Sequence, residues 1–174
     1  MQDMTPAEQQ FRAELVNLLP RLRRFARALA RHREDADDLV QAALERALTR
    51  REQWTPGTRL DSWMFKIINN AWIDEVRSRA RRDALFAPEE EGEGVGAPQA
   101  GSPVDAIAVR RAMALLNDDQ RAAVGLVLVE GLPYKEAAEV LGIPIGTLTS
   151  RLARAREQLQ AALADAAGGA EAAR

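Results

Sequence analysis

Residues Tyr134–Arg156 read YKEAAEVLGIPIGTLTSRLARAR, and this order of residues has the layout of a helix-turn-helix. A first helix is predicted over Tyr134–Leu141, because Gly142 then supplies the left-handed residue that commonly ends a helix. Pro144 falls near the first turn of the following helix, where its missing N–H costs nothing. Two helices joined by a short turn are therefore expected in this part of the chain.

The second helix of this unit has two unlike faces. At about 100° per residue, its apolar side chains gather on one side, and the residues on that side are Leu148, Leu152, Ala155 and Leu159. The opposite side carries Thr147, Ser150 and Arg154, with Arg151 at its edge. Hydroxyl and guanidinium groups on such a face can reach base edges and phosphates in the major groove of DNA. A surface helix with solvated arginines is the alternative; periodicity alone leaves both open, and the Gly and Pro positions of the turn favour DNA binding.

The composition indicates a helical protein of one or two domains. The chain has 174 residues, of which 47% are hydrophobic and 5% aromatic, and it is rich in the helix formers Ala, Leu and Arg. It contains no cysteine, which excludes disulfides, thiolate metal sites and a cysteine nucleophile. No apolar stretch reaches the ~18 residues of a membrane helix, and the start of the chain lacks a signal-peptide pattern. We therefore expect a soluble, cytoplasmic protein without membrane insertion.

Acidic charge is concentrated in the middle of the chain. The net charge is −2, and residues 87–109 carry five acidic and no basic side chains. The stretch Phe86–Pro103, FAPEEEGEGVGAPQAGSP, has almost nothing to bury and is predicted to be a flexible linker. The predicted fold is all-α, with two small helical domains. Their predicted ranges are 1–85 and 104–165, joined by the linker 86–103 and followed by a disordered tail over 166–174.

Three helices are predicted in the N-terminal domain. The first begins near residue 6 and has a kink or break near Pro20. Asp35 or Asp37 is expected to cap the second helix, and Asp61 or Ser62 the third. The core positions expected in the second helix are Leu39, Ala42, Ala43, Leu44 and Leu48.

The C-terminal domain is predicted to contain two helices before the helix-turn-helix. The first ends near Leu116, and the second runs from about Asp118 to Glu130. The cluster Asn117-Asp118-Asp119 lies between them and suits a helix cap.

The third helix of the N-terminal domain is predicted to end at about Arg82. It combines aromatic, amide and basic side chains. These are Trp63, Phe65, Asn69, Asn70, Trp72, Arg77, Arg79, Arg81 and Arg82. Rings can stack on unpaired bases, amides can read base edges and arginines can hold the backbone, so the combination favours single-stranded nucleic acid. The alternatives are a core role for Trp63 and Phe65 and a solvated helix end for the arginine run.

Three segments carry a resemblance to one protein family. They are Asp37–Ala43 (DDLVQAA), Trp63–Asn70 (WMFKIINN) and Tyr134–Arg156. On these residues the chain resembles a bacterial extracytoplasmic-function (ECF) sigma factor, the small two-domain class of RNA polymerase initiation subunits. The resemblance covers nearly the whole chain and implies a region-2 domain followed by a region-4 domain. The segment Leu19–Ala26 further resembles the general-stress branch found in alphaproteobacteria.

The resemblance implies a role for each segment. The residues that would bind the polymerase clamp are Asp37, Asp38, Gln41 and Glu45. Those that would bind the −10 element are Trp63, Lys66, Asn69, Asn70, Trp72, Asp74, Arg77, Arg79, Arg81 and Arg82. Asn70 matches a position that helps to choose the −10 base, and a loop from about Asn69 to Asp74 would hold a flipped base.

The same resemblance assigns the −35 element to the second helix of the helix-turn-helix. The residues that would contact it are Thr147, Thr149, Ser150, Arg151, Arg154 and Arg156. Two positions depart from the family pattern. Thr149 stands in place of a basic residue and Ala42 in place of Glu, which puts one DNA contact and one clamp contact in question.

The implied function is to direct core RNA polymerase to the promoters of a stress- or signal-responsive regulon. The implied partners are core RNA polymerase, through its β′ clamp and β flap, promoter DNA and an anti-sigma factor, and the free protein is expected to be a monomer. No cofactor or metal is expected. An enzyme is not expected either, because the single His32 has no evident catalytic partner.

Two other hypotheses remain open. A sigma-like decoy would bind an anti-sigma factor and no promoter, but the presence of Ser150 and Arg154 argues for a working DNA face. A stand-alone helix-turn-helix transcriptional regulator would leave the aromatic and basic third helix of the N-terminal domain without a task.

Overall fold

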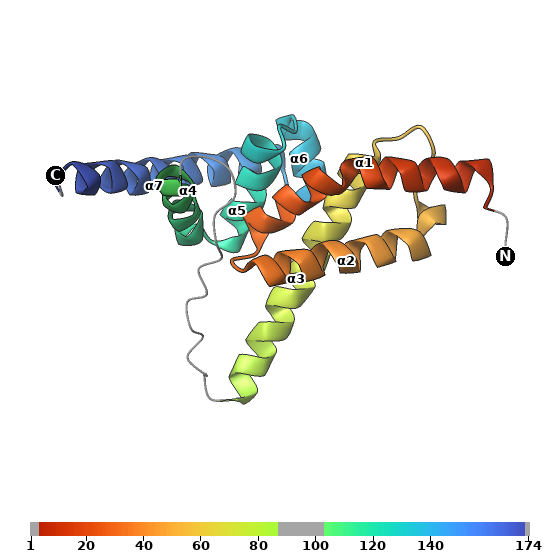
Figure 1. Cartoon of the computed structure of the whole chain (residues 1–174), viewed down its shortest axis with the longest axis horizontal. Coiled ribbons are helices and arrows are strands. Elements are labelled where there is room, and N and C mark those ends of the chain that lie inside the picture. The colour runs from red at the N-terminus through yellow and green to blue at the C-terminus, as the bar shows by residue number, and fades with distance from the viewer. Residues whose placement is uncertain (1–3, 87–102, 173–174) are drawn as a thin grey trace.

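The computed structural model describes residues 4–86 and 103–172, and every regular element in these two ranges is helical. In chain order the elements are α1 (Pro6–Leu29), α2 (Arg33–Thr49), the 3-10 turn η1 (Arg51–Gln53), α3 (Leu60–Leu85), α4 (Pro103–Leu115), α5 (Asp118–Val124), the π-helical turn η2 (Gly125–Val129), α6 (Tyr134–Leu141) and α7 (Ile145–Ala172) (Figure 1). The all-α prediction is confirmed. The predicted linker over 86–103 lies, apart from its two end residues, outside the described residues.

Helices α1, α2 and α3 pack around a core of aromatic and aliphatic side chains. Phe25 of α1 meets Phe65 of α3 edge to face, with 5.2 Å between the ring centroids. Both rings are fully buried, together with Leu22, Met64 and Ile68. Each large buried side chain contributes about 1.5–3 kcal/mol, so this core fixes α3 against α1. Phe65 therefore has the core role that was the alternative to nucleic-acid contact.

The predicted interruption near Pro20 is not a break, because α1 continues through this residue. Proline removes one helical hydrogen bond, but Leu15 and Leu22 on either side are buried in the same core. Packing on both sides thus keeps the helix continuous. At its start, α1 has a capping box between Thr5 and Glu8.

The predicted caps of α2 and α3 are wrong. Both helices begin earlier than expected, after residues whose side chains make no capping bond. Asp35, Asp37, Asp61 and Ser62 therefore lie inside the helices, and the Asp61 carboxylate is held by arginines instead. Leu48 was also predicted wrongly as a core residue, since it is 46% exposed on the outer side of α2.

Helices α4 to α7 form the C-terminal half of the structure. Asn117 caps α5 in a capping box with Gln120, as predicted. Where one helix to about Glu130 was predicted, α5 changes into the π turn η2. Gly142 has a φ of +65° and ends α6 at the predicted residue. Helix α7 continues to Ala172, whereas a disordered tail was predicted from residue 166.

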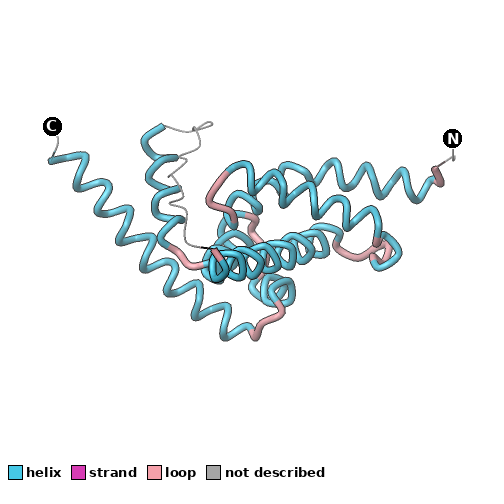
Figure 2. The backbone as a smooth tube through the Cα atoms, turned by 90° about the horizontal axis from the view of Figure 1, so that it is seen from below, coloured by secondary structure: helices cyan, strands magenta, loops and turns pink. Residues whose placement is uncertain are grey.

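The two halves of the chain pack against each other along α1 and α3. Helix α5 and the turn η2 lie against α1, and α6 lies against α3 (Figures 1 and 2). The approach is closest at Gly125 of η2, where a Cβ would lie 3.0 Å from Cδ2 of Phe25 and 3.2 Å from Cβ of Ala28. The missing side chain at residue 125 lets η2 come this close to α1.

Candidate nucleic-acid interface

The exposed face of α7 carries the side chains predicted to contact duplex DNA. Its buried face is as predicted and consists of Leu148, Leu152 and Ala155, with Leu159 partly buried. Ser150 and Arg154 are exposed. The Ser150 hydroxyl donates to the carbonyl of Gly146 at 3.1 Å, which leaves its lone pairs to accept a bond. Arg154 has no hydrogen bond or ion pair within the described part of the chain, so its guanidinium can bind an anion.

Three of the other predicted residues of α7 make contacts within their own half of the chain. Arg151 lies 3.2 Å from Asp119, and Arg156 donates to the Tyr134 hydroxyl at 3.1 Å. Thr149 is exposed and bonds to the carbonyl of Ile145 at 2.9 Å, and Thr147 is half-buried. These contacts engage both arginines within their own half of the chain, although Arg156, like Arg154, is exposed.

Helix α3 divides the residues predicted to contact single-stranded DNA between its two sides. Asn69 and Trp72 are only 4% and 6% exposed. The predicted residues that are exposed are Lys66, Asn70, Asp74, Arg77, Arg81 and Arg82, with Trp63 half-buried. The predicted loop from Asn69 to Asp74 is wrong, because these residues lie within the continuous helix α3. Any base contact by α3 therefore has to come from its exposed side.

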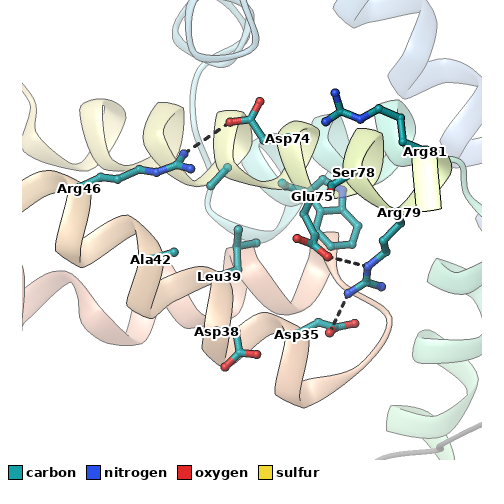
Figure 3. Close-up of a pocket in the computed structure, with 12 residues that line it drawn as sticks. Asp35, Asp38, Leu39, Ala42, Arg46, Asp74, Glu75, Ser78, Arg79 and Arg81 are labelled. Carbon is teal, nitrogen blue, oxygen red and sulfur yellow. Dashed lines mark hydrogen bonds and ion pairs between the residues drawn. The ribbon is translucent and has the colours of Figure 1, made fainter.

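Arg79 and Asp74 take part in ion pairs between α2 and α3 (Figure 3). Arg79 lies 2.8 Å from Asp35 of α2 and 2.9 Å from Glu75 of α3, and the bonds to these two carboxylates raise the pKa of the Arg79 side chain. Asp74 lies 3.7 Å from Arg46 of α2. The pairs border a cavity of about 490 Å³ between the two helices. Arg79 thus ties α3 to α2, which makes it less available to DNA than the exposed arginines.

The residues predicted to bind the polymerase clamp all lie exposed on α2. They are Asp37, Asp38, Gln41 and Glu45. The spacing of four residues from 37 to 41 to 45 places three of them on one face of the helix. The Gln41 amide donates to Glu45 at 3.4 Å. Three of the four residues are carboxylates, so the exposed surface of α2 that carries them is acidic.

A chain of ion pairs that the sequence did not reveal links the two halves. Glu130, whose side chain is 0% exposed, lies 3.0 Å from Arg21 and 3.1 Å from Arg24. Arg59 pairs with Glu136 of α6. All three arginines belong to the N-terminal half and both carboxylates to the C-terminal half. Charge complementarity therefore joins the halves in addition to the packing at Gly125.

Asp61 connects the arginines on the N-terminal side. Its carboxylate lies 2.8 Å from Arg21 and 2.7 Å from Arg59. Burial raises the pKa of Asp61, but the hydrogen bonds from Arg59 and Arg21 outweigh burial and lower the pKa to about 2. The partners of Arg21 are 40 and 109 residues away along the chain, so no local sequence pattern indicated this network.

Within the described residues, no helix is long and apolar enough to span a membrane. In the same ranges, no group of three or more His, Asp or Glu side chains is placed to hold a metal ion.

Two stretches of the chain match known protein families. Residues 15–69 match the family described as the Sigma2 domain of PhyR, and residues 106–159 match Sigma-70, region 4. The second match contains the whole helix-turn-helix, and the first contains α2 and the beginning of α3. Fold and matches together define the class of the protein as an RNA polymerase sigma factor.

The family is identified by the similarity of the chain to individual proteins. The ECF RNA polymerase sigma factor EcfG of Rhodopseudomonas palustris is 34% identical over 162 residues, which cover 91% of this chain and 87% of that protein. SigM of Mycobacterium tuberculosis, also an ECF sigma factor, is 38% identical over 138 residues, 79% of this chain and 69% of that protein. The chain belongs to the family of ECF RNA polymerase sigma factors, as the sequence predicted, and sigma factors are not enzymes.

A solved structure supports the same assignment. The sigma factor RpoE of Bartonella quintana, in complex with the anti-sigma factor NepR, superposes with a TM-score of 0.81 at 35% identity, covering 89% of this chain and 97% of that chain. The superposition spans both halves of the structure, so the two proteins also share the arrangement of these halves.

Proposed function

We propose that the protein directs core RNA polymerase to promoters through two DNA contacts, one made by α7 with the −35 duplex and one made by α3 with the −10 strand. The observation that carries the proposal is the exposed face of α7, where Ser150 and Arg154 face solvent opposite a buried apolar stripe. An Arg fork matches two acceptors of a guanine or a phosphate. The domain ranges predicted from the sequence, a region-2 domain over 1–85 and a region-4 domain over 104–165, are part of the proposal.

The strand contact uses the exposed side of α3. Trp63 can stack on a base, Asn70 can bond to a base edge, and Lys66 and Arg77 can neutralise phosphates. Extracting a base from a duplex costs a few kcal/mol, and each good base contact returns about 1–3 kcal/mol. Each contact alone therefore binds a promoter weakly. When both contacts are made from one polymerase, binding of the first raises the effective concentration of the second.

The remaining surfaces suit protein partners. The acidic face of α2, with Asp37, Asp38, Gln41 and Glu45, is proposed to bind the β′ clamp, and the region-4 domain to bind the β flap. The solved relative RpoE is bound to the anti-sigma factor NepR, which supports an anti-sigma factor as a partner of this chain. We propose that the chain acts in the cytoplasm, has no catalytic activity and is monomeric when free.

The test is runoff transcription with purified core polymerase and a library of promoter fragments. Transcripts that depend on the added chain are expected, and their templates should share two upstream elements. A chain that binds core polymerase but starts no transcript from any fragment would contradict the proposal.

The match of residues 15–69 to the Sigma2 domain of PhyR favours one second candidate. PhyR is described as an anti-anti-sigma factor complexed with the anti-sigma factor NepR, so the second candidate is a decoy that binds an anti-sigma factor and no promoter. In that case the chain would bind an anti-sigma factor and give no transcripts, and Arg154→Ala would have no effect on any activity.

A further inference from the structure

Two neighbouring hydroxyl side chains of α7, Thr149 and Ser150, are bonded to the backbone of their own helix. The Thr149 hydroxyl donates to the Ile145 carbonyl at 2.9 Å, and the Ser150 hydroxyl donates to the Gly146 carbonyl at 3.1 Å. Each bond uses the single hydrogen that a hydroxyl can donate. Both side chains are exposed, so in this arrangement each hydroxyl can accept a hydrogen bond from a base but cannot donate one.

The two side chains differ by one methyl group, which belongs to Thr149. A hydroxyl bond to the carbonyl four residues earlier is a known arrangement of Ser and Thr in helices. In Thr149 this bond fixes χ1, which is already restricted in a β-branched side chain. The γ-methyl group of Thr149 is therefore held in one position relative to α7. It offers apolar surface without the loss of rotamer freedom that a long, flexible side chain undergoes on binding.

Thr149 lies beside Ser150 on the part of α7 that is proposed to enter the major groove. Residues four apart are neighbours on a helix, so Thr149 is next to Ala153, and Ser150 is next to Arg154. All four side chains are exposed. The first turns of a recognition helix contact the base edges, and α7 begins at Ile145. Thr149 is therefore in the part of the helix that reaches the bases.

The chemistry of these four side chains defines which base edges they can recognise. The guanidinium fork of Arg154 matches the two acceptors of a guanine. Ser150 and Thr149 offer lone pairs, and Thr149 and Ala153 add methyl groups. In the major groove, the methyl groups of Ala and Thr side chains make apolar contact with the C5-methyl group of thymine. A guanine and a thymine are thus the bases that fit this end of α7.

We propose that Thr149 recognises a thymine of the −35 element, through contact between its γ-methyl group and the C5-methyl group of the base, with the Ala153 methyl group beside it. The position at which the chain departs from the family pattern thus supplies an apolar base contact. This inference rests on the proposed function, because it takes α7 as the helix that binds the −35 duplex.

The test uses the full chain with core polymerase and promoter fragments that differ by a single methyl group. In the −35 element that the parent selects from a promoter library, each thymine is replaced in turn by deoxyuridine, which lacks only the C5-methyl group. Competition between the two fragments measures the ratio of their affinities. For the parent we expect one thymine whose replacement weakens binding about fourfold, which corresponds to one buried methyl group.

Two substitutions of Thr149 separate the methyl group from the hydroxyl. Thr149→Ser keeps the hydroxyl and removes the methyl group, so it should bind the thymine and deoxyuridine fragments equally. Thr149→Val keeps a γ-methyl group and removes the hydroxyl, so it should retain the ratio of the parent. The ratio is taken within each protein, so a general loss of stability or affinity does not change it.

Thr49→Ser is the matched control. Thr49 is exposed on α2 and makes the same kind of bond, from its hydroxyl to the Glu45 carbonyl at 2.7 Å. Its substitution removes the same methyl group from the same arrangement, but on a helix outside the proposed −35 contact. Thr49→Ser should therefore show the fourfold ratio of the parent.

Several results would overturn the inference. They are a selected −35 element in which no thymine is sensitive to the replacement, a Thr149→Ser protein that retains the ratio of the parent, and a Thr149→Val protein that loses it. Runoff transcription by the parent is measured in parallel. A parent that transcribes from the selected promoters but gives one of these results overturns this inference alone. A parent that selects no −35 element overturns the proposed function and this inference with it.

Discussion

Helices α3 and α7 both carry side chains suited to DNA, but they differ in how many of these side chains are exposed. In α7 the predicted polar residues are exposed or half-buried, and the apolar stripe is buried. In α3 the predicted set is split, since Asn69 and Trp72 are buried while Asn70 and Arg77 are exposed. The reason is where the neighbours of each helix lie, because α7 also contacts three helices, α4, α5 and α6, but its buried residues are those of the apolar stripe alone. Helix α3 contacts α1 and α2 in its own half and α6 in the other, so its neighbours cover polar positions as well as apolar ones.

This difference teaches that residue type is a weaker guide on a helix that is packed on several sides. The exposed face of α7 can be predicted from the sequence, because it lies opposite a single apolar stripe. For α3 the exposed face follows only from the positions of α2 and α6, which lie far away in the sequence. The contrast can be tested helix by helix, starting with the change of largest expected effect.

Trp72→Ala should act on stability. Because Trp72 is 6% exposed, truncating it should lower the free energy of unfolding by about 3–5 kcal/mol. Asn70→Ala, two residues away on the exposed side, should change it by less than about 0.5 kcal/mol. Urea denaturation of both variants measures this. A Trp72→Ala protein as stable as the parent would show that the indole is not a core group.

Arg154→Ala should act on DNA binding and leave stability unchanged. The guanidinium is exposed and free to contact bases or phosphates, so we expect a loss of about 1–3 kcal/mol in binding to the −35 duplex. The measurement is competition of promoter fragments for the polymerase bound to this chain. Gln160→Ala, exposed further along α7, is the control. An Arg154→Ala protein that binds the −35 fragment like the parent would remove Arg154 from the DNA face.

Asp61 should make the free energy of unfolding depend on pH in the acidic range. Its pKa of about 2 is below the ~3.9 of an unfolded Asp. The charged Asp61 therefore contributes fully to the free energy of unfolding above about pH 4, and this contribution is lost as the pH falls toward 2. Over this window the parent should lose about 1–2 kcal/mol more than Asp61→Asn. Urea denaturation across the window measures the difference, and equal slopes for the two proteins would contradict the depressed pKa.

Arg77→Ala and Arg79→Ala form a matched pair with the smallest expected effects. Arg77 is exposed, so its loss should reduce strand binding by up to about 1 kcal/mol and lower the salt dependence of binding. Arg79 is held by Asp35 and Glu75, so its loss should instead reduce stability by about 0.5–1 kcal/mol. Anisotropy titrations and urea denaturation distinguish the two. The reverse assignment of effects would show that Arg79 leaves its ion pairs to bind DNA.

The first helix of the helix-turn-helix could be predicted to the residue, because its signals are local. Gly142 has the left-handed conformation that its place in the sequence indicated. Outside the helix-turn-helix, Asn117 likewise caps α5 through a bond to a residue three positions away. Leu148 and Leu152 repeat every four residues on one face. Each of these features is set by neighbours within about one turn of helix.

The features that were missed depend on partners far away in the chain. Asn69 is an ordinary polar residue in the sequence, and its burial follows from the helices that cover this side of α3. Glu130 is an ordinary acidic residue whose partners Arg21 and Arg24 lie 109 and 106 residues away. The start of α3 was misplaced because Asp61 looked like a cap, whereas two arginines use its carboxylate.

The measurement that addresses the whole account is sequencing of runoff transcripts from a promoter library, with core polymerase and the parent, Arg154→Ala or Asn70→Ala chain. The parent should select two upstream elements. Arg154→Ala should weaken selection at the −35 element alone, and Asn70→Ala should change the preferred base at the −10 element alone. Transcripts with the same two elements for all three proteins would contradict the division of promoter recognition between α7 and α3.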